Sequence, residues 1–184
     1  MDRKTIAVIG ESVISKKSMK YKSAIALGKM LVDNNFRIQH GGRGGVMEAV
    51  TIGARMSKKY REGMVIGILP GFSSKKANSY LEVVFPTGLD IMRNFLVVNA
   101  DAVVVIGGKA GTLSEIAIAW LLKKMIIAYD IEGWSGKLAG TKIDSRKRVP
   151  FKDDIIFKVS NENEVLDYLN KYLELYNKNY TRIG

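Results

Sequence analysis

The chain alternates between short apolar runs and longer segments whose apolar residues recur every three or four positions. The short runs, typical of buried strands, lie at residues 5–9, 37–40, 64–69, 102–106, 125–129 and 155–159. The periodic segments, typical of amphipathic helices, lie near residues 21–31, 46–59, 88–99, 112–123 and 165–176. This alternation predicts an α/β fold, a doubly wound and mostly parallel Rossmann-like sheet with helices on both faces.

The length of 184 residues predicts one domain, residues 1–184, that binds a nucleotide. No segment has the apolar length of a membrane span, and the first strand begins almost at once, so we expect a cytoplasmic protein. The sequence has no cysteine and one histidine, His40, which lies just before a glycine loop. This composition excludes disulfides and cysteine nucleophiles, and we expect neither a metal site nor a cofactor. His40 itself is either a pocket residue or a loop residue.

A glycine-rich turn follows the apolar strand at residues 102–106. Gly107, Gly108 and Gly111 permit a tight turn, and a helix that begins near Thr112 would aim its free N–H groups at an anion above the turn. Lys109 adds a positive charge there. This segment therefore predicts a phosphate-binding loop.

Glu115, in the first turn of that predicted helix, has two interpretations. It can act on a ligand held over the loop, or it can close a capping box with Thr112 and so serve only the helix.

A second glycine-rich loop follows the short strand at residues 37–40. Its residues are Gly41, Gly42, Arg43, Gly44 and Gly45. Two strand–glycine–helix units in one domain predict that both loops line one cleft at the carboxyl edge of the sheet. Gly10 and Ser12, after the first strand, are expected at the same edge. The chain lacks a Gly-Lys-Ser/Thr ending and the full Gly-x-Gly-x-x-Gly fingerprint, so a P-loop and nicotinamide binding are not favoured.

The formal charge of +11 is the strongest oddity of the composition. Many basic residues fall in or near predicted loops, namely Lys16, Lys17, Arg43, Lys75, Lys76, Lys109, Arg146, Lys147 and Arg148. A positive field at the ligand edge would attract phosphorylated small molecules and would also attract nucleic acid.

Four segments together resemble the Lonely Guy family of Rossmann-like proteins, often labelled lysine decarboxylases. They are residues 41–47, 87–93, 100–102 and 107–115. The resemblance runs from the first strand to about residue 136. It implies cleavage of the N-glycosidic bond of nucleoside 5′-monophosphates, with Arg93 and Glu115 catalytic and Gly108, Gly111 and Thr112 in the phosphate loop. It also implies a homodimer with pockets near the subunit interface.

The chain departs from the family pattern at several places, including a first glycine loop and a gap from Arg93 to Asp101 that are each one residue shorter. Gly107 stands where the family has proline, Lys109 where it has glycine, and Met92 and Asn94 flank Arg93 where the family has histidine and lysine. These features resemble a sister branch that includes molybdenum-cofactor carriers and nucleotide-binding proteins. Two alternatives to the phosphoribohydrolase therefore stay open: a non-catalytic carrier of a phosphorylated nucleotide or molybdenum cofactor, and a nucleic-acid-binding protein related to DNA-processing proteins.

Two further expectations concern apolar residues outside the core. The segment at residues 91–98 is more apolar than one helix packed on a sheet requires, which also favours a homodimer. Trp134 is either a lid over a bound base or a packed aromatic residue.

Overall fold

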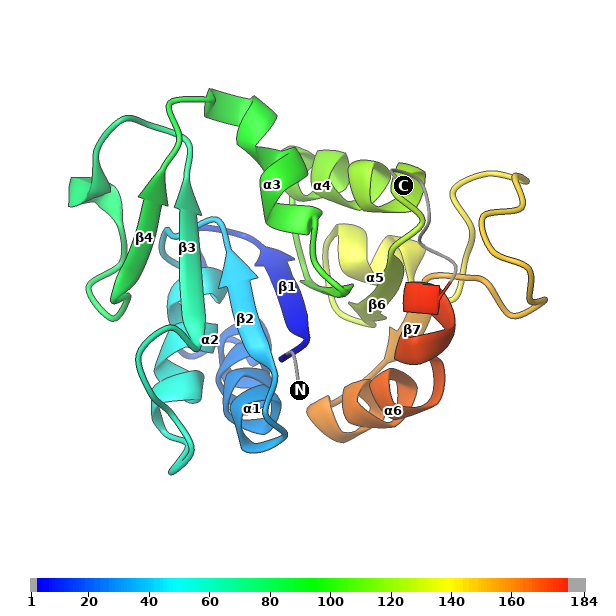
Figure 1. Ribbon diagram of the computed structural model, residues 1–184, viewed down its shortest axis with the longest axis horizontal. Coiled ribbons are helices and arrows are strands. Elements are labelled where there is room, and N and C mark those ends of the chain that lie inside the picture. Colours follow the sequence, from blue (N-terminus) through cyan, green and yellow to red (C-terminus); the bar gives the residue numbers. More distant parts are fainter. Residues whose placement is uncertain (1–2, 179–184) are drawn as a thin grey trace.

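The computed structural model describes residues 3–178 and shows one parallel sheet between two layers of helices (Figure 1). The strands pair in the order β4-β3-β2-β1-β5-β6-β7, and each of these pairings is parallel. Their bounds are β1 Thr5–Gly10, β2 Arg37–His40, β3 Val65–Leu69, β4 Val83–Pro86, β5 Ala102–Ile106, β6 Met125–Tyr129 and β7 Phe157–Val159. The predicted α/β, Rossmann-like class is confirmed.

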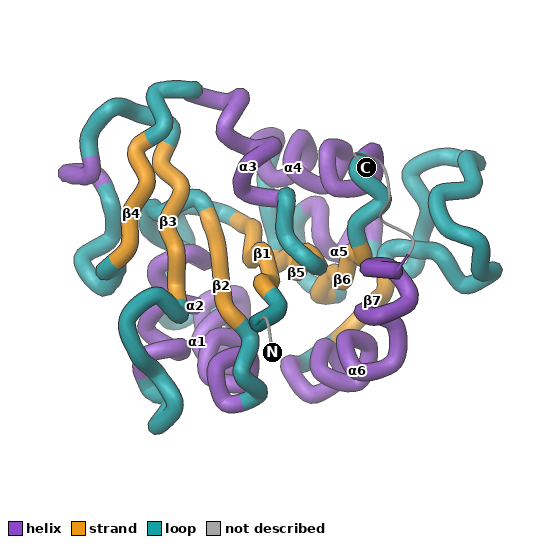
Figure 2. Tube along the Cα trace, viewed as in Figure 1, coloured by secondary structure: helices purple, strands orange, loops and turns teal. Residues whose placement is uncertain are grey.

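Helices cover both faces of the sheet. Figure 2 shows α1, α2 and α6 on one side and α3, α4 and α5 on the other. The α-helices are α1 Met19–Asp33, α2 Val46–Arg55, α3 Asn94–Val98, α4 Ala110–Leu121, α5 Trp134–Leu138 and α6 Glu162–Lys178, and the 3-10 helices are η1 Ser74–Lys76 and η2 Asp90–Arg93.

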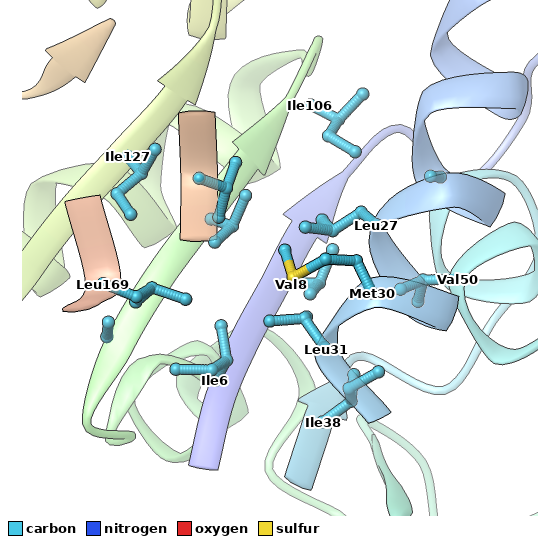
Figure 3. Packing of buried hydrophobic residues seen from close by; sticks show 14 of the residues in the cluster. Ile6, Val8, Leu27, Met30, Leu31, Ile38, Val50, Ile106, Ile127 and Leu169 are labelled. Atoms are coloured by element: carbon cyan, nitrogen blue, oxygen red, sulfur yellow. The ribbon is translucent and has the colours of Figure 1, made fainter. Parts of the chain in front are cut away.

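The core is double because each central strand is buried on both faces. Along β1, Ile6 and Val8 pack with α1 and α6, whereas Ala7 and Ile9 pack with α3 and α4. Figure 3 shows the first of these clusters, where Leu27 and Leu31 of α1 meet the strands. All five residues of β5 are buried, which explains its unbroken apolar sequence.

The order of the strands defines where a ligand would bind. From β1 in the middle, the chain continues to β2 on one side and later returns to β5 on the other. The loops that leave β1 and β5 therefore separate at the carboxyl edge, and in open α/β sheets such a switch point opens a crevice.

Element boundaries differ from the sequence expectation at several places. Helix α2 ends at Arg55 rather than near residue 59, and the segment expected at 88–99 is divided into η2 and α3. Strand β4 at Val83–Pro86 is not among the predicted strands, and it pairs with β3. Within residues 3–178, no helix combines the length and apolar character that a membrane span requires.

Candidate functional site

A cleft of about 420 Å³ opens at the carboxyl edge of the sheet, at the switch point. The loop after β1, the first glycine loop, the η2–α3 segment and the start of α4 line it. Nine of the predicted site residues lie in its wall: Gly10, Ser12, Gly41, Arg43, Arg93, Lys109, Gly111, Thr112 and Glu115. Both glycine loops thus contribute to one cleft, as their repeated pattern predicts.

The remaining predicted glycines lie behind this wall. Gly42 and Gly45 have positive φ angles of 74° and 65°, and Gly45 is the residue from which α2 begins. Such angles suit glycine because it has no Cβ atom. Gly42, Gly44, Gly45, Gly107 and Gly108 shape the loops and are not among the residues that line the cleft. Their predicted ligand contacts stay untested.

The amide groups of the second glycine turn are already engaged by side chains. The N–H of Gly107 donates to Oγ of Ser135 at 2.8 Å, and the N–H of Gly108 donates to Oε1 of Glu11 at 3.2 Å. A phosphate in this cleft must therefore bind at the next residues, Lys109 to Thr112, or displace one of these side chains.

The capping-box interpretation of Glu115 is wrong. Helix α4 begins at Ala110, two residues earlier than predicted, so its first turn contains no acidic residue and Glu115 falls in the second turn. Lys109 precedes the helix and provides no side-chain cap. Glu115 is therefore too far along α4 to satisfy the first N–H groups, and its carboxylate has another partner.

That partner is Arg93. Nη1 of Arg93 donates to Oε1 of Glu115 at 3.1 Å, and the side chains are only 14% and 9% exposed. Burial raises the pKa of Glu115 to about 7 despite the nearby guanidinium, which works in the opposite direction. In the described part of the chain, Nε of Arg93 is buried without a hydrogen-bond partner. A carboxyl group with a raised pKa, beside an arginine whose Nε has no hydrogen-bond partner, is typical of a functional site.

The neighbouring elements hold this pair in place. A Cβ atom at Gly41 would lie 2.8 and 2.9 Å from the two terminal nitrogens of Arg93, so the glycine leaves room for the guanidinium. Asn94 donates to Ser114 at 2.9 Å and links α3 to α4 beside the ion pair.

His40 supports the first glycine loop and does not line the cleft. Its Nδ1 accepts from the N–H of Gly42 at 3.0 Å, so the ring proton is on Nε2, which lies 2.9 Å from Oγ1 of Thr51. The Thr51 hydroxyl in turn donates to the Met47 carbonyl. The side chain is fully buried, and burial, with a smaller contribution from the Arg93 charge, lowers the pKa of His40 to about 3.

Replacing His40 by glutamine is expected to weaken the acid sensitivity of the fold. A lowered pKa means that the neutral ring contributes stability above pH ~6.5, the unfolded value, and that this contribution disappears as the pH falls toward 3. His40→Gln should be less stable than the wild type at pH 7, and the gap should narrow between pH 6.5 and 4. Urea unfolding at several pH values measures this gap. A difference in stability that stays constant between pH 6.5 and 4 would contradict the lowered pKa of His40.

The structure corrects the expectation for Arg148 and, of the two interpretations of Trp134, favours the packed aromatic residue over the lid. Arg148 is only 3% exposed, so the basic loop at residues 145–150 presents less positive charge to solvent than its sequence indicates. Trp134 is partly buried against the second core cluster with Nζ of Lys137 4.7 Å from its ring centre, and it does not line the cleft. Within residues 3–178, no group of three His, Asp or Glu residues is placed to hold a metal ion.

Sequence reasoning missed Glu11, Asp90 and Asn94, all of which line the cleft. The signal that could have identified these three residues is their position in the sequence. Glu11 directly follows Gly10 at the end of the first strand, Asp90 begins the 3-10 helix that ends at Arg93, and Asn94 directly follows Arg93.

Comparison with solved structures supports the fold. The chain is similar to TM1055, whose X-ray structure is 34% identical, covers 91% of this chain and 99% of its own, and has a TM-score of 0.79. It is also similar to the molybdenum cofactor binding protein of Rippkaea orientalis, with 26% identity, 93% and 98% coverage and a TM-score of 0.74.

Comparison of sequences defines the family. An uncharacterised protein of Archaeoglobus fulgidus is 35% identical over 115 residues, which is 62% of this chain and 72% of that protein. The model of the SLOG cluster4 family matches residues 3–165. The expected relationship is thus confirmed for the Rossmann-like SLOG superfamily but not for the Lonely Guy branch in particular. The chain belongs to the SLOG cluster4 family.

Proposed function

We propose that the cleft binds a nucleoside 5′-monophosphate and that the protein hydrolyses its N-glycosidic bond. The observation that carries this proposal is the buried Arg93–Glu115 pair in the cleft wall, one turn beyond the start of α4. An ion pair with only a structural role does not need to line a cleft. The other structural role, capping of α4 by Glu115, is excluded by the start of the helix at Ala110.

The phosphate group would lie over the first turn of α4. The N–H groups at the start of a helix point along its axis, and their dipoles favour an anion there. The Lys109 side chain is exposed beside this turn, and Arg43 stands across the cleft in the first glycine loop. These groups supply the positive charge that a phosphate requires, while Arg93 lies deeper and is engaged with Glu115.

The reaction requires a carboxylate near the ribose. Water adds to C1′ as the C1′–N bond breaks, the base leaves with the bonding electrons, and the proton that water loses ends on the base. The transition state resembles an oxocarbenium ion, so an ionised Glu115 would stabilise its positive charge and orient the water. Arg93 would keep Glu115 in position and favour its ionised form.

The direct test is incubation of the purified protein with adenosine, guanosine, cytidine, uridine and inosine 5′-monophosphates, followed by chromatography of the free bases. Release of one base with equimolar ribose 5-phosphate is the expected result. Tight binding of a monophosphate without release of its base would sink the hydrolase proposal and leave the cleft as a binding site.

A carrier of molybdenum cofactor is the second candidate. The similarity to the Rippkaea orientalis protein at 26% identity over nearly the whole chain favours it. A carrier needs the same phosphate site and has no need of an ionised Glu115. Binding of the cofactor, together with unchanged affinity in Glu115→Gln, would favour this function.

We also propose that two copies associate through the face that η2 and α3 expose. Its apolar side chains are between 39% and 72% exposed, and they are Leu89, Ile91, Met92, Phe95 and Leu96. Sedimentation should show a dimer for the wild type and a monomer for Phe95→Glu. A wild type that remains monomeric across concentrations would exclude this association.

A further inference from the structure

Glu11 joins the two glycine loops at the cleft. Its backbone carbonyl accepts the first N–H of α2, from Val46, at 2.9 Å. Its carboxylate accepts the N–H of Gly108 at 3.2 Å, across the cleft wall in the second glycine turn. The Glu11 carboxylate, an anion of the protein itself, is thus hydrogen-bonded to the Gly108 amide at the edge of the proposed phosphate site.

Lys20 keeps this carboxylate ionised. Nζ of Lys20 lies 2.6 Å from Oε1 of Glu11, and both side chains are nearly buried at 13% and 10% exposure. Burial works to raise the pKa of Glu11, but the Lys20 ammonium and the Gly108 amide outweigh it and hold the pKa below its usual value. The carboxylate is therefore charged throughout the neutral range.

The contact of Glu11 with Gly108 is weaker than its contact with Lys20, and the carboxylate has space beside it into which it can turn. At 3.2 Å the amide contact is at the long end of the hydrogen-bond range. A second hollow of about 330 Å³ lies on the other side of Glu11, lined by Lys20 and Glu132. Nζ of Lys20 is also 3.6 Å from Oε2 of the exposed Glu132, so the ammonium faces that hollow.

We propose that a phosphate group of the ligand displaces the Glu11 carboxylate from Gly108, and that Glu11 turns toward the second hollow together with Lys20. Glu11 is then a specificity-determining residue. A ligand anion enters only if its own attraction to the Gly108 amide, Lys109 and the start of α4 exceeds that of the carboxylate, which favours a dianionic phosphate over a singly charged group. The inference rests on the proposed phosphate site, but it does not require hydrolysis.

The test compares Glu11→Gln with Glu132→Gln in calorimetric titrations of inorganic phosphate. Both variants lose one negative charge near Lys20, but only Glu11 lines the main cleft. Removing a charge that competes directly should raise phosphate affinity by roughly fivefold or more. Removing the exposed charge of Glu132 should change it by less than about twofold. Thermal melts establish that both variants fold.

Three results would overturn the inference. The first is weaker phosphate binding in Glu11→Gln, which would make Glu11 a positioning residue for the turn. The second is an equal gain in phosphate affinity in both variants. The third is no phosphate binding in the wild type or in either variant. If Glu11→Gln fails to fold, the wild type decides by nuclear magnetic resonance, because phosphate must shift the Gly108 amide signal. Base release, assayed in parallel, separates the hydrolase proposal from the displacement proposal. If the protein releases base but phosphate does not shift the Gly108 amide signal, the displacement proposal is rejected and the hydrolase proposal stands.

Discussion

Replacing Glu115 by glutamine is expected to lower the turnover of a nucleoside 5′-monophosphate by roughly two to three orders of magnitude. Glutamine has nearly the same shape and still accepts a hydrogen bond from Arg93, so the cleft should keep its form. What it lacks is the negative charge, and that charge acts mainly where positive charge develops in the transition state. The substrate dissociation constant should therefore change much less than the turnover number.

Glu48→Gln is the matched control for this change. Glu48 is a carboxylate in the first turn of α2, with Oε1 3.5 Å from Nζ of Lys16 and outside the cleft wall. Its loss should leave turnover within about twofold, because this carboxylate lies outside the cleft wall and touches neither Arg93 nor Glu115. If Glu115→Gln behaves like Glu48→Gln, the carboxylate of Glu115 has no catalytic role.

The pH dependence of turnover offers an independent check on the same residue. Because burial raises the pKa of Glu115 to about 7, the ionised form increases as the pH passes from 6 to 8, and turnover should rise with it. Glu115→Gln should lack this rise. The stability contribution has the opposite sign, since a raised pKa stabilises the fold below pH ~4.5 and that benefit is lost as the pH rises through 7.

The elements and the place of the cleft could be predicted because local sequence determines them. The apolar run of β5 needs cover on both faces, and a glycine turn after a parallel strand opens at the carboxyl edge. Glu115 was predicted from its place in the helix after the glycine turn, whereas Arg93 was predicted from motif similarity alone. Their contact joins residues 22 positions apart, and no periodicity in the sequence indicates it.

Contacts formed by the tertiary structure could not be predicted. Helix α4 begins two residues earlier than predicted, and Gly108 just before it binds two distant segments: its carbonyl accepts from Trp134 and its N–H donates to Glu11. Glu11 contacts Lys20 and Gly108 together, and neither pairing follows a sequence rule. His40 was expected to be a pocket residue or a loop residue because it precedes the glycines, yet its side chain is fully buried and contacts Thr51 of α2.

Arg148 is the strongest example of such a contact. The sequence places it in the most basic loop, but Nε donates to Oδ2 of Asp154 at 3.0 Å and Nη2 donates to Oδ1 of the same carboxylate. The guanidinium carbon lies 3.6 Å from the centre of the Trp120 ring. Nη1 donates to the carbonyl of Lys124, and the hydroxyl of Tyr176 donates to Asp154. The Arg148–Asp154 pair thus connects the loop, the end of α4 and α6.

Replacing Arg148 by alanine is accordingly expected to lower the free energy of unfolding by about 3–5 kcal/mol. The change leaves the buried carboxylate of Asp154 without a cation, and it removes a side chain that packs on Trp120. Urea unfolding followed by circular dichroism measures the loss. Arg146→Ala is the control, because Arg146 in the same loop is 54% exposed and its ion pair with Asp144 should contribute less than about 1 kcal/mol. Equal losses in the two variants would show that the buried network stabilises the fold no more than a surface pair. A loss confined to Arg148→Ala would show that the loop is anchored from the interior.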